Sequence, residues 1–233
     1  ENGVERILEG LKNFDIKIDE GFIDFDKCVG DYGPYKQRER AEIYQAFAKK
    51  MVKDGLAYPC FCTEEELTEI RNIQEEKKIL PGYHSEFAKC RELSLEQIEE
   101  NIKNGLPYVV RMKSPGSPDK RISFKDGIRG NIEMPENIVD VVILKSDGIP
   151  TYHFAHVVDD YLMGTTVVIR GDEWISSAPI HLQMFYLLKL KAPKYAHIAP
   201  IMKEDEGGKR KISKRKDPEA AVTYYSEEGY PVE

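Results

Sequence analysis

The chain has 233 residues, of which 41% are hydrophobic and 32% are charged. These proportions are typical of a globular protein with a substantial core, in one large domain or two medium ones. Lys and Arg number 34 against 41 Asp and Glu, so the net charge of -7 excludes a global positive field that attracts nucleic acid. No apolar run approaches the roughly 20 residues that a membrane helix needs, which indicates a cytoplasmic protein without a membrane segment.

The first part of the chain, residues 1–57, predicts two amphipathic helices. One face of the first helix carries the apolar residues Val4, Ile7, Leu8, Leu11 and Phe14. A loop rich in glycine and aromatic residues is expected over about 19–35, and the second helix over about 36–54. Since Glu1 opens the chain without an initiator Met, we expect a piece of a longer polypeptide, called the parent below.

Residues 58–148 predict a small α+β insert. Two capping boxes, Thr63 with Glu66 and Ser94 with Gln97, each open a helix. Short alternating strands are expected near 108–113, 120–124, 128–134 and 139–145. Because highly charged helices and short strands differ in character from the flanking segments, we expect this part to form a domain of its own.

Residues 149–203 predict the main sheet. Strands are expected over 150–158, 165–170 and 195–201, with a helix from about 177 to 190 between the last two. A strand, a helix and a second apolar strand form a βαβ unit, which implies a parallel sheet. Ligands of such sheets bind at the carboxyl ends of the strands, so Arg170 should face the binding crevice.

Arg170 is the central candidate for binding an anion. Its permanently charged fork matches a carboxylate or a phosphate, and an ion pair with a neighbouring acid explains it equally well. Tyr152 and His156, four residues apart, should line the same crevice, with ordinary packing as the alternative. Asp159 and Asp160 could hold a magnesium ion, but a solvated turn fits such a pair better.

Residues 209–216 form a basic run that we expect to be a mobile loop. A glycine pair precedes it, and Asp217 with Pro218 predicts a helix start directly after it. Such a run is commonly a solvated face, a targeting tag or a loose nucleic-acid patch. Alternatively, Lys214, or Lys211 as second choice, stabilises the charge that develops on pyrophosphate when a nucleoside triphosphate is cleaved. The loop follows the last strand and should therefore share the crevice of Arg170.

Four cysteines are too few for a disulfide framework in a chain of this length. Cys60, Cys62 and Cys90 lie close in sequence and offer three thiolates, and zinc prefers four ligands in a tetrahedron. Tyr83 and His84 are the nearby candidates for the fourth ligand. Three buried structural cysteines without a metal remain the alternative.

Five segments also carry a resemblance to a known family. Lys211-Ile212-Ser213-Lys214-Arg215 is similar to the Lys-Met-Ser-Lys-Ser motif of class I aminoacyl-tRNA synthetases. The other four are Gly33-Pro34-Tyr35-Lys36-Gln37-Arg38-Glu39-Arg40, Pro59-Cys60-Phe61-Cys62, Pro150-Thr151-Tyr152-His153-Phe154 and Val168-Ile169-Arg170-Gly171-Asp172-Glu173-Trp174. Their order and content resemble glutamyl-tRNA synthetases over essentially the whole chain.

The resemblance implies an α/β fold, with an incomplete Rossmann-type parallel-sheet catalytic core and an inserted α+β domain that holds the tRNA acceptor end. Its expected parts are the first part of the core at 1–57, the insert at 58–148, the second part of the core at 149–203, and the Lys-x-Ser-Lys loop with the start of a helical domain at 204–233. The family's N-terminal strand with its His-x-Gly-His motif should precede Glu1, and the anticodon-binding region should lie outside the chain. We therefore expect residues 1–233 alone to form negligible adenylate.

The resemblance also implies residue roles and partners. Tyr152, His156 and Arg170 would bind glutamate, with Arg170 on the side-chain carboxylate, although many relatives carry Asn in place of His156. Glu173, Trp174 and Lys214 would lie near ATP, and Lys211 with Lys214 would act on its phosphates. The implied cofactor is ATP with Mg²⁺, and the implied partners are glutamate and tRNA, bound by a monomer. A structural Zn²⁺ ion stays one of the two alternatives for the cysteines, because the spacing from Tyr83 to Cys90 is longer than in zinc-binding relatives.

Two other functions remain open from the sequence. A glutaminyl-tRNA synthetase of the same subclass would share most of these motifs, but Arg170 favours an anionic side chain over a neutral amide. A non-catalytic RNA-binding module would use 209–216 and the insert as cationic contacts.

Overall fold

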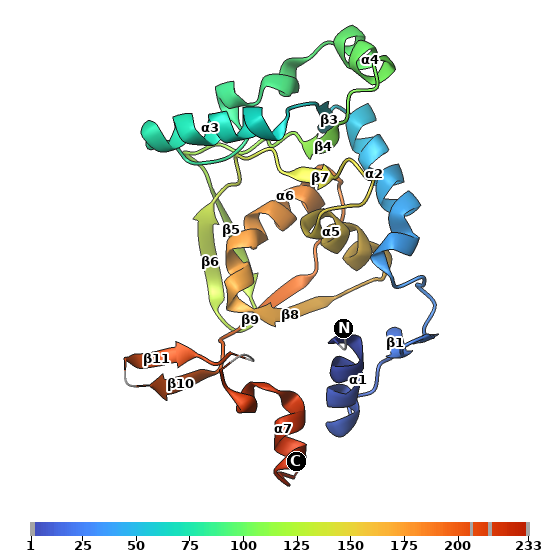
Figure 1. The fold of residues 1–233 in the computed structure, drawn as a ribbon, viewed down its shortest axis with the longest axis vertical. Coiled ribbons are helices and arrows are strands. Elements are labelled where there is room, and N and C mark those ends of the chain that lie inside the picture. Colours follow the sequence, from blue (N-terminus) through green and yellow to red (C-terminus); the bar gives the residue numbers. More distant parts are fainter. Residues whose placement is uncertain (1–2, 206, 214–215, 232–233) are drawn as a thin grey trace. The chain divides into compact units, whose positions relative to one another are not determined.

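The computed structural model of the chain describes residues 3–205, 207–213 and 216–231 (Figure 1). The chain divides into two compact units. The large unit is Gln37–His197, and the small unit combines Glu1–Lys36 with Ile198–Glu233.

One sheet of the large unit is antiparallel and has three strands. Their order is β3 (Ala57–Cys60), β4 (Val109–Met112) and β7 (Val142–Leu144). All four residues of β3 are buried, and β3 lies at the edge of the sheet, where Pro59 can be accommodated despite its missing N–H donor. The strands expected near 108–113 and 139–145 are thereby confirmed.

Three helices of the large unit pack beside this sheet. They are α2 (Ala41–Lys53), α5 (Tyr152–Leu162) and α6 (Ala178–Leu187). Helix α5 contacts both α2 and α6, and α2 contacts β7 (Figure 1). Their inward faces supply most of the main core, including Tyr44, Met51, Phe154, Val157, Met184 and Phe185. The helices expected over 36–54 and 177–190 are confirmed, with a 3-10 turn at Gln37–Arg40 in front of α2.

The strand expected over 150–158 is wrong, because this segment forms helix α5. Thr151 donates its hydroxyl to the carbonyl of Val142 at 2.7 Å, which ties the start of the helix to β7. The buried residues of the segment are Phe154, Ala155, Val157 and Val158. Their spacing follows one helical face, and a short apolar run of this kind fits either period until tertiary packing selects one.

The second sheet of the large unit is mixed. Its order is β6 (Gly130–Pro135), β5 (Arg121–Asp126), β9 (Lys194–Ile198) and β8 (Val167–Gly171). Strands β5 and β6 form an antiparallel hairpin, whereas β5 and β9 pair in parallel, with Asp126 opposite Tyr195. Helix α6 lies between β8 and β9 in the chain, as the βαβ pattern predicts. The mixed sheet and its helices confirm the α/β class, while the expected domain limits stay predictions.

Helices α3 and α4 of the large unit begin at the two capping boxes that the sequence predicts. Helix α3 (Glu64–Glu76) and helix α4 (Leu95–Lys103) both start with a complete capping box. At α3, the Thr63 hydroxyl accepts the Glu66 N–H at 3.3 Å, and the Thr63 N–H donates to the Glu66 carboxylate at 3.0 Å. Two short 3-10 helices, Ser85–Phe87 and Lys89–Glu92, lie between α3 and α4.

The described residues of the small unit form two hairpins, a short 3-10 helix and two α-helices that contact each other. Helix α1 (Gly3–Asn13) contacts helix α7 (Val222–Glu227). Strands β1 (Gly21–Asp24) and β2 (Lys27–Val29) form a hairpin inside the segment that we expected to be a loop. No helix among residues 3–205, 207–213 and 216–231 is long and apolar enough to cross a bilayer.

The basic run differs from the mobile loop that we expected. Its first residues lie in β11 (Gly208–Lys211), which pairs in antiparallel register with β10 (Met202–Asp205). Asp217 does not cap the following 3-10 helix, Pro218–Ala220, with its side chain. Its carboxylate instead accepts two hydrogen bonds from Arg210, at 2.6 and 2.7 Å. A salt bridge therefore replaces the predicted cap.

Truncating Phe154 tests whether α5 is the centre of the core. The ring is fully buried, so Phe154→Ala should lower the free energy of unfolding by about 3–5 kcal/mol. Urea unfolding followed by circular dichroism measures the change. Tyr186→Ala on α6 is the matched control, since its ring is 77% exposed and its loss should cost less than about 0.5 kcal/mol. Equal losses in the two variants would contradict the assignment of the core.

Candidate functional site

Arg170 lies near the end of β8 and is half-buried. Its Nε donates to His197 Nε2 at 3.0 Å, its Nη1 to His181 Nδ1 at 3.1 Å, and its Nη2 to the carbonyl of Trp174 at 3.3 Å. The guanidinium carbon lies 4.6 Å from the centre of the Tyr195 ring. Hydrogen bonds at its three nitrogens and the contact of one face with the Tyr195 ring thus fix the guanidinium. We call Arg170, His181, His197, Asp126 and Tyr195 the arginine cluster.

The guanidinium dictates where the protons of its histidine partners sit. Because arginine can only donate hydrogen bonds, both His197 Nε2 and His181 Nδ1 must accept. His197 therefore carries its proton on Nδ1, which lies 2.6 Å from Asp126 Oδ2. His181 carries its proton on Nε2 and donates to His153 Nδ1 at 2.9 Å. Each histidine of the cluster is neutral in this arrangement.

The electrostatics of the cluster agree with a neutral His181 and an ionised Asp126. Burial lowers the pKa of His181 to about 2, and the positive charge of Arg170 adds to this effect. Burial acts to raise the pKa of Asp126, but hydrogen bonds from the backbone of Arg129 and Ile128 and from His197 outweigh it and lower the pKa to about 2. Asp126 therefore carries a negative charge at neutral pH.

Aromatic side chains form a wall next to Arg170. The Tyr152 ring lies 4.6 Å from the Trp174 ring and is stacked on His156 at 6.0 Å between centres. Tyr152 is 50% exposed, so this wall is open to solvent. His156 Nδ1 lies 2.8 Å from Asp160 Oδ2, and His156 Nε2 lies 3.2 Å from the Tyr195 hydroxyl. The structure thus brings Tyr152, His156, Arg170 and Trp174 together, as the sequence suggests.

The hydrogen bonds of Arg170 decide what more it can bind. A guanidinium has five N–H groups, and three are used by His197, His181 and Trp174. At most two remain, one on each terminal nitrogen, and a carboxylate can accept a pair of this kind. The ion pair that we weighed with a neighbouring acid is not formed with Asp172, which instead accepts from Arg129 at 2.7 Å.

The acidic residues around the cluster have structural partners. Asp159 lies on α5, where it accepts from Arg40 at 2.8 Å and from the Tyr44 hydroxyl at 2.6 Å, so the solvated turn expected at this pair is wrong. Glu173 is exposed in the 3-10 helix Asp172–Ser177, and its main-chain carbonyl accepts the Ser176 hydroxyl. The predicted role of Glu173 near ATP stays a prediction.

The basic residues of the predicted catalytic run lie in the small unit. Lys211 is the last residue of β11 and is exposed. Lys214 and Arg215 lie outside the described residues. Asp217 anchors the segment, because it is buried and accepts the N–H of Ser213 at 2.9 Å in addition to its bonds from Arg210. Arg210 lowers the pKa of the Asp217 carboxyl well below its ordinary value. That the run shares a crevice with Arg170 stays a prediction.

The three cysteines come together in the large unit. The sulfur atoms of Cys60, Cys62 and Cys90 lie within 4.8 Å of one another, and those of Cys62 and Cys90 are 3.7 Å apart. The Tyr83 hydroxyl lies 3.1 Å from Cys62 Sγ, whereas His84 uses its ring nitrogens on the Leu80 carbonyl and the Ser85 hydroxyl. The hydrogen bond with Cys90 lowers the pKa of the Cys60 thiol. Tyr83, and not His84, is therefore placed as the fourth candidate ligand.

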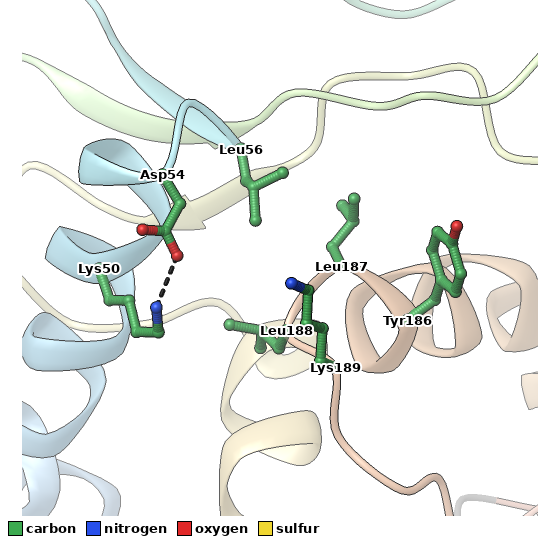
Figure 2. Close-up of a pocket in the computed structure, with 7 residues that line it drawn as sticks. All are labelled: Lys50, Asp54, Leu56, Tyr186, Leu187, Leu188 and Lys189. Carbon is green, nitrogen blue, oxygen red and sulfur yellow. Dashed lines mark hydrogen bonds and ion pairs between the residues drawn. The ribbon is translucent and has the colours of Figure 1, made fainter.

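A separate pocket opens between the end of α2 and the end of α6 (Figure 2). It is lined by Lys50, Asp54, Leu56, Tyr186, Leu187, Leu188 and Lys189. Lys50 and Asp54 form an ion pair at 2.6 Å across one of its walls (Figure 2). None of the lining residues belongs to the arginine cluster, so we do not assign this pocket to the candidate site.

Sequence reasoning missed four members of the arginine cluster, namely Asp126, His181, Tyr195 and His197. The pair Asp126-Gly127 by itself predicts only a tight turn, and His181 and His197 lie inside apolar runs that predict a helix and a strand. The one available signal was that His181 and His197 are titratable residues inside apolar runs. Such runs are expected to be buried, and a buried polar side chain needs a hydrogen-bond partner.

Comparisons with known proteins identify relatives over the whole length of the chain. Residues 1–233 match the family model described as tRNA synthetases class I (E and Q), catalytic domain. The chain is 54% identical over 232 residues to the glutamate–tRNA ligase of Clostridium beijerinckii, covering 100% of this chain and 42% of the relative. It is 55% identical over 231 residues to that of Clostridium perfringens, with 99% and 42% covered. The chain thus spans less than half the length of these relatives.

A solved structure with a similar fold is the glutamate tRNA ligase of Elizabethkingia meningosepticum in complex with its amino acid. The TM-score is 0.81 at 35% sequence identity, with 99% of this chain and 44% of that chain covered.

Replacing His181 tests its neutral, buried state. The histidine pKa falls from 6.5 to about 2 on folding, so between these values only the unfolded chain binds the proton. Stability from this group is complete above pH 6.5 and falls with decreasing pH, by up to about 1.4 kcal/mol per pH unit. We expect His181→Gln to flatten the decline in free energy of unfolding between pH 6.5 and about 5, measured with urea. An unchanged slope would show that His181 does not titrate in this way.

Proposed function

The chain belongs to the catalytic-domain family of class I tRNA synthetases for glutamate and glutamine, and from this premise we propose that its parent is a glutamate–tRNA ligase. The observation that carries the proposal is Arg170, a half-buried cation whose described partners at its nitrogens are neutral and which keeps at most two N–H groups for a ligand. A glutamate side-chain carboxylate supplies two acceptors and the missing negative charge. The amide of glutamine supplies one acceptor and no charge, which disfavours a glutaminyl enzyme.

The proposed reaction has two steps. An oxygen of the glutamate α-carboxylate forms a bond to the α-phosphorus of ATP, taken up with Mg²⁺, while the bond from that phosphorus to pyrophosphate breaks. A terminal ribose hydroxyl of tRNA then forms an ester with the activated carbonyl, and AMP leaves. Tyr152 and His156 would flank the glutamate held by Arg170.

The remaining residues act on the nucleotide in this proposal. Glu173 and Trp174 would lie near ATP, and Lys211 with Lys214 would stabilise the charge that grows on the departing pyrophosphate. Residues 58–148 would contact the acceptor end of tRNA. A monomeric, cytoplasmic parent belongs to the same proposal, as does the inactivity of residues 1–233 alone.

A non-catalytic RNA-binding module is the weaker alternative. It explains the basic run, but it leaves the organised environment of Arg170 without a purpose. The net charge of -7 also disfavours a protein that binds RNA through general electrostatic attraction.

Kinetics of the parent should separate Arg170 from Lys214. Arg170→Ala removes a contact made already in the ground state and should weaken glutamate binding by about 2–5 kcal/mol. Lys214→Ala should lower the rate of activation with little effect on ATP binding, because the lysine acts as charge develops. Glutamate-dependent pyrophosphate exchange, with and without tRNA, measures both effects at varied glutamate and ATP.

Arg6→Ala is the control for losing an arginine, since Arg6 is exposed on α1, has no role in this proposal and should leave the kinetics unchanged. If Lys214→Ala raises only the ATP Michaelis constant with turnover intact, the lysine is a static phosphate contact and its transition-state role is wrong.

We also propose that Cys60, Cys62 and Cys90 hold a structural zinc ion with Tyr83 as fourth ligand. Zinc–sulfur bonds of about 2.3 Å in a tetrahedron place two sulfurs roughly 3.8 Å apart. The 3.7 Å between Cys62 and Cys90 and the nearby Tyr83 hydroxyl fit such a site. A zinc ion there would tie β3 to the 3-10 helix Lys89–Glu92.

Elemental analysis tests the zinc site. Protein purified without chelator should contain about one zinc per chain, and Cys62→Ser should lose it because a structural site needs four ligands. Tyr83→Phe should weaken zinc binding while keeping the three thiolates. Cys28→Ser is the control, since Cys28 is exposed and belongs to the small unit. Absence of stoichiometric zinc in the unaltered protein would leave three structural cysteines.

A further inference from the structure

Asp126 has a buried carboxylate whose two oxygens accept hydrogen bonds from different donors. It lies at the end of β5 and is only 2% exposed. Oδ1 accepts the backbone N–H groups of Ile128 and Arg129, both at 2.9 Å, and that of His197 at 3.3 Å. Oδ2 accepts the Nδ1–H of His197 at 2.6 Å. The three backbone donors fix the orientation of the carboxylate, so Oδ2 is aimed at the imidazole.

His197 links the fixed carboxylate of Asp126 to Arg170 and thereby orients the guanidinium. Its ring is fully buried on β9, between Asp126 on one side and the Arg170 Nε–H on the other. A carboxylate on Nδ1 stabilises the tautomer that leaves Nε2 free of a proton, and only this tautomer can accept from a guanidinium. Because a long arginine side chain has many rotamers, an acceptor fixed at Nε restricts both its direction and the plane of its fork.

We propose that Asp126 and His197 are positioning residues that aim Arg170 at the side-chain carboxylate of the amino-acid substrate. This inference rests on the proposed function, in which Arg170 binds glutamate. With Nε held by His197 and the guanidinium lying on Tyr195, the donors that remain on the terminal nitrogens are directed in advance. Preorganisation of this kind lowers the entropy that substrate binding must overcome.

The proposal makes an isosteric substitution informative. In Asp126→Asn the three backbone N–H groups require an acceptor at the Oδ1 position, so the amide nitrogen must take the place of Oδ2. It then donates to His197 Nδ1 and stabilises the opposite tautomer. That tautomer places an N–H on Nε2, opposite the N–H of Arg170 Nε, and two donors repel each other. The ring keeps its place in the core but loses its acceptor for Arg170.

A purely structural role for Asp126 predicts something else. In that case the carboxylate only closes the turn that follows β5, and Asn, a common turn residue, preserves this function through its carbonyl oxygen. Asp126→Asn would then leave the affinity for glutamate unchanged. The two roles differ in the glutamate Michaelis constant and in the tautomer of one histidine.

The test uses pyrophosphate exchange by the parent with Asp126→Asn, His197→Phe and His197→Gln. The first two should raise the glutamate Michaelis constant about 10- to 100-fold, with turnover and the ATP Michaelis constant changed far less. His197→Gln should recover most of the affinity, because its amide can donate to Asp126 and accept from Arg170. Asp140→Asn is the matched control: it also alters a fully buried carboxylate, one bound to Arg91 and Ser114, and should leave the glutamate Michaelis constant unchanged.

Proton–nitrogen spectra of parent labelled with ¹⁵N-histidine provide the second measurement. They should show His197 protonated on Nδ1 in the unaltered protein and on Nε2 in Asp126→Asn. If Arg170→Ala raises the glutamate Michaelis constant but Asp126→Asn does not, or the tautomer stays the same, the positioning proposal is overturned and the proposed function stands. If Arg170→Ala itself leaves that constant unchanged, the proposed function fails first.

Discussion

A guanidinium can only donate hydrogen bonds, and this constraint governs the part of the large unit that surrounds Arg170. Each group that meets its nitrogens must be an acceptor, and the structure supplies two imidazoles and a main-chain carbonyl. These come from β9, α6 and the 3-10 helix after β8, so one side chain fixes the relation of three elements. Since the imidazoles accept, they are neutral, and burial keeps His181 in that state. The packing of these elements around Arg170 therefore requires that His181 and His197 be neutral.

Features that depend on neighbours in sequence were predictable. The capping boxes at Thr63 and Ser94 appear where the sequence places them, because both partners of each box lie within three residues. Helix α5 was not predictable in this way, since an apolar run with paired valines fits a strand as well as a helix. Its burial against α2 and α6, which are distant in sequence, decides the outcome. The basic run was misjudged for a similar reason, because its pairing with β10 depends on the register of a hairpin.

In the candidate site, too, some residues could be predicted from local sequence, whereas others depend on contacts between distant parts of the chain. Arg170, Tyr152, His156 and Trp174 could be named from motifs, and the three cysteines from their residue type. The choice of Tyr83 over His84 required the structure, because only the fold shows that His84 bonds to Leu80 and Ser85 instead. Asp126 and His197 are 71 residues apart and meet because β5 and β9 pair in parallel. The tautomer of His197 depends on this pairing, so no local sequence pattern could predict it.

The chain contains two arginines with contrasting arrangements, and the contrast explains why one of them suits a substrate. Arg210 binds Asp217 directly through two hydrogen bonds, so its charge is neutralised by the protein and the pair fastens a segment of the small unit. Arg170 is linked to Asp126 only through a neutral imidazole, which places the compensating charge on the far side of His197. The aspartate therefore orients the guanidinium without occupying its fork. A cation that is held in place and yet keeps its charge for an incoming carboxylate needs this separation, because a direct ion pair would have to be broken before the substrate could bind.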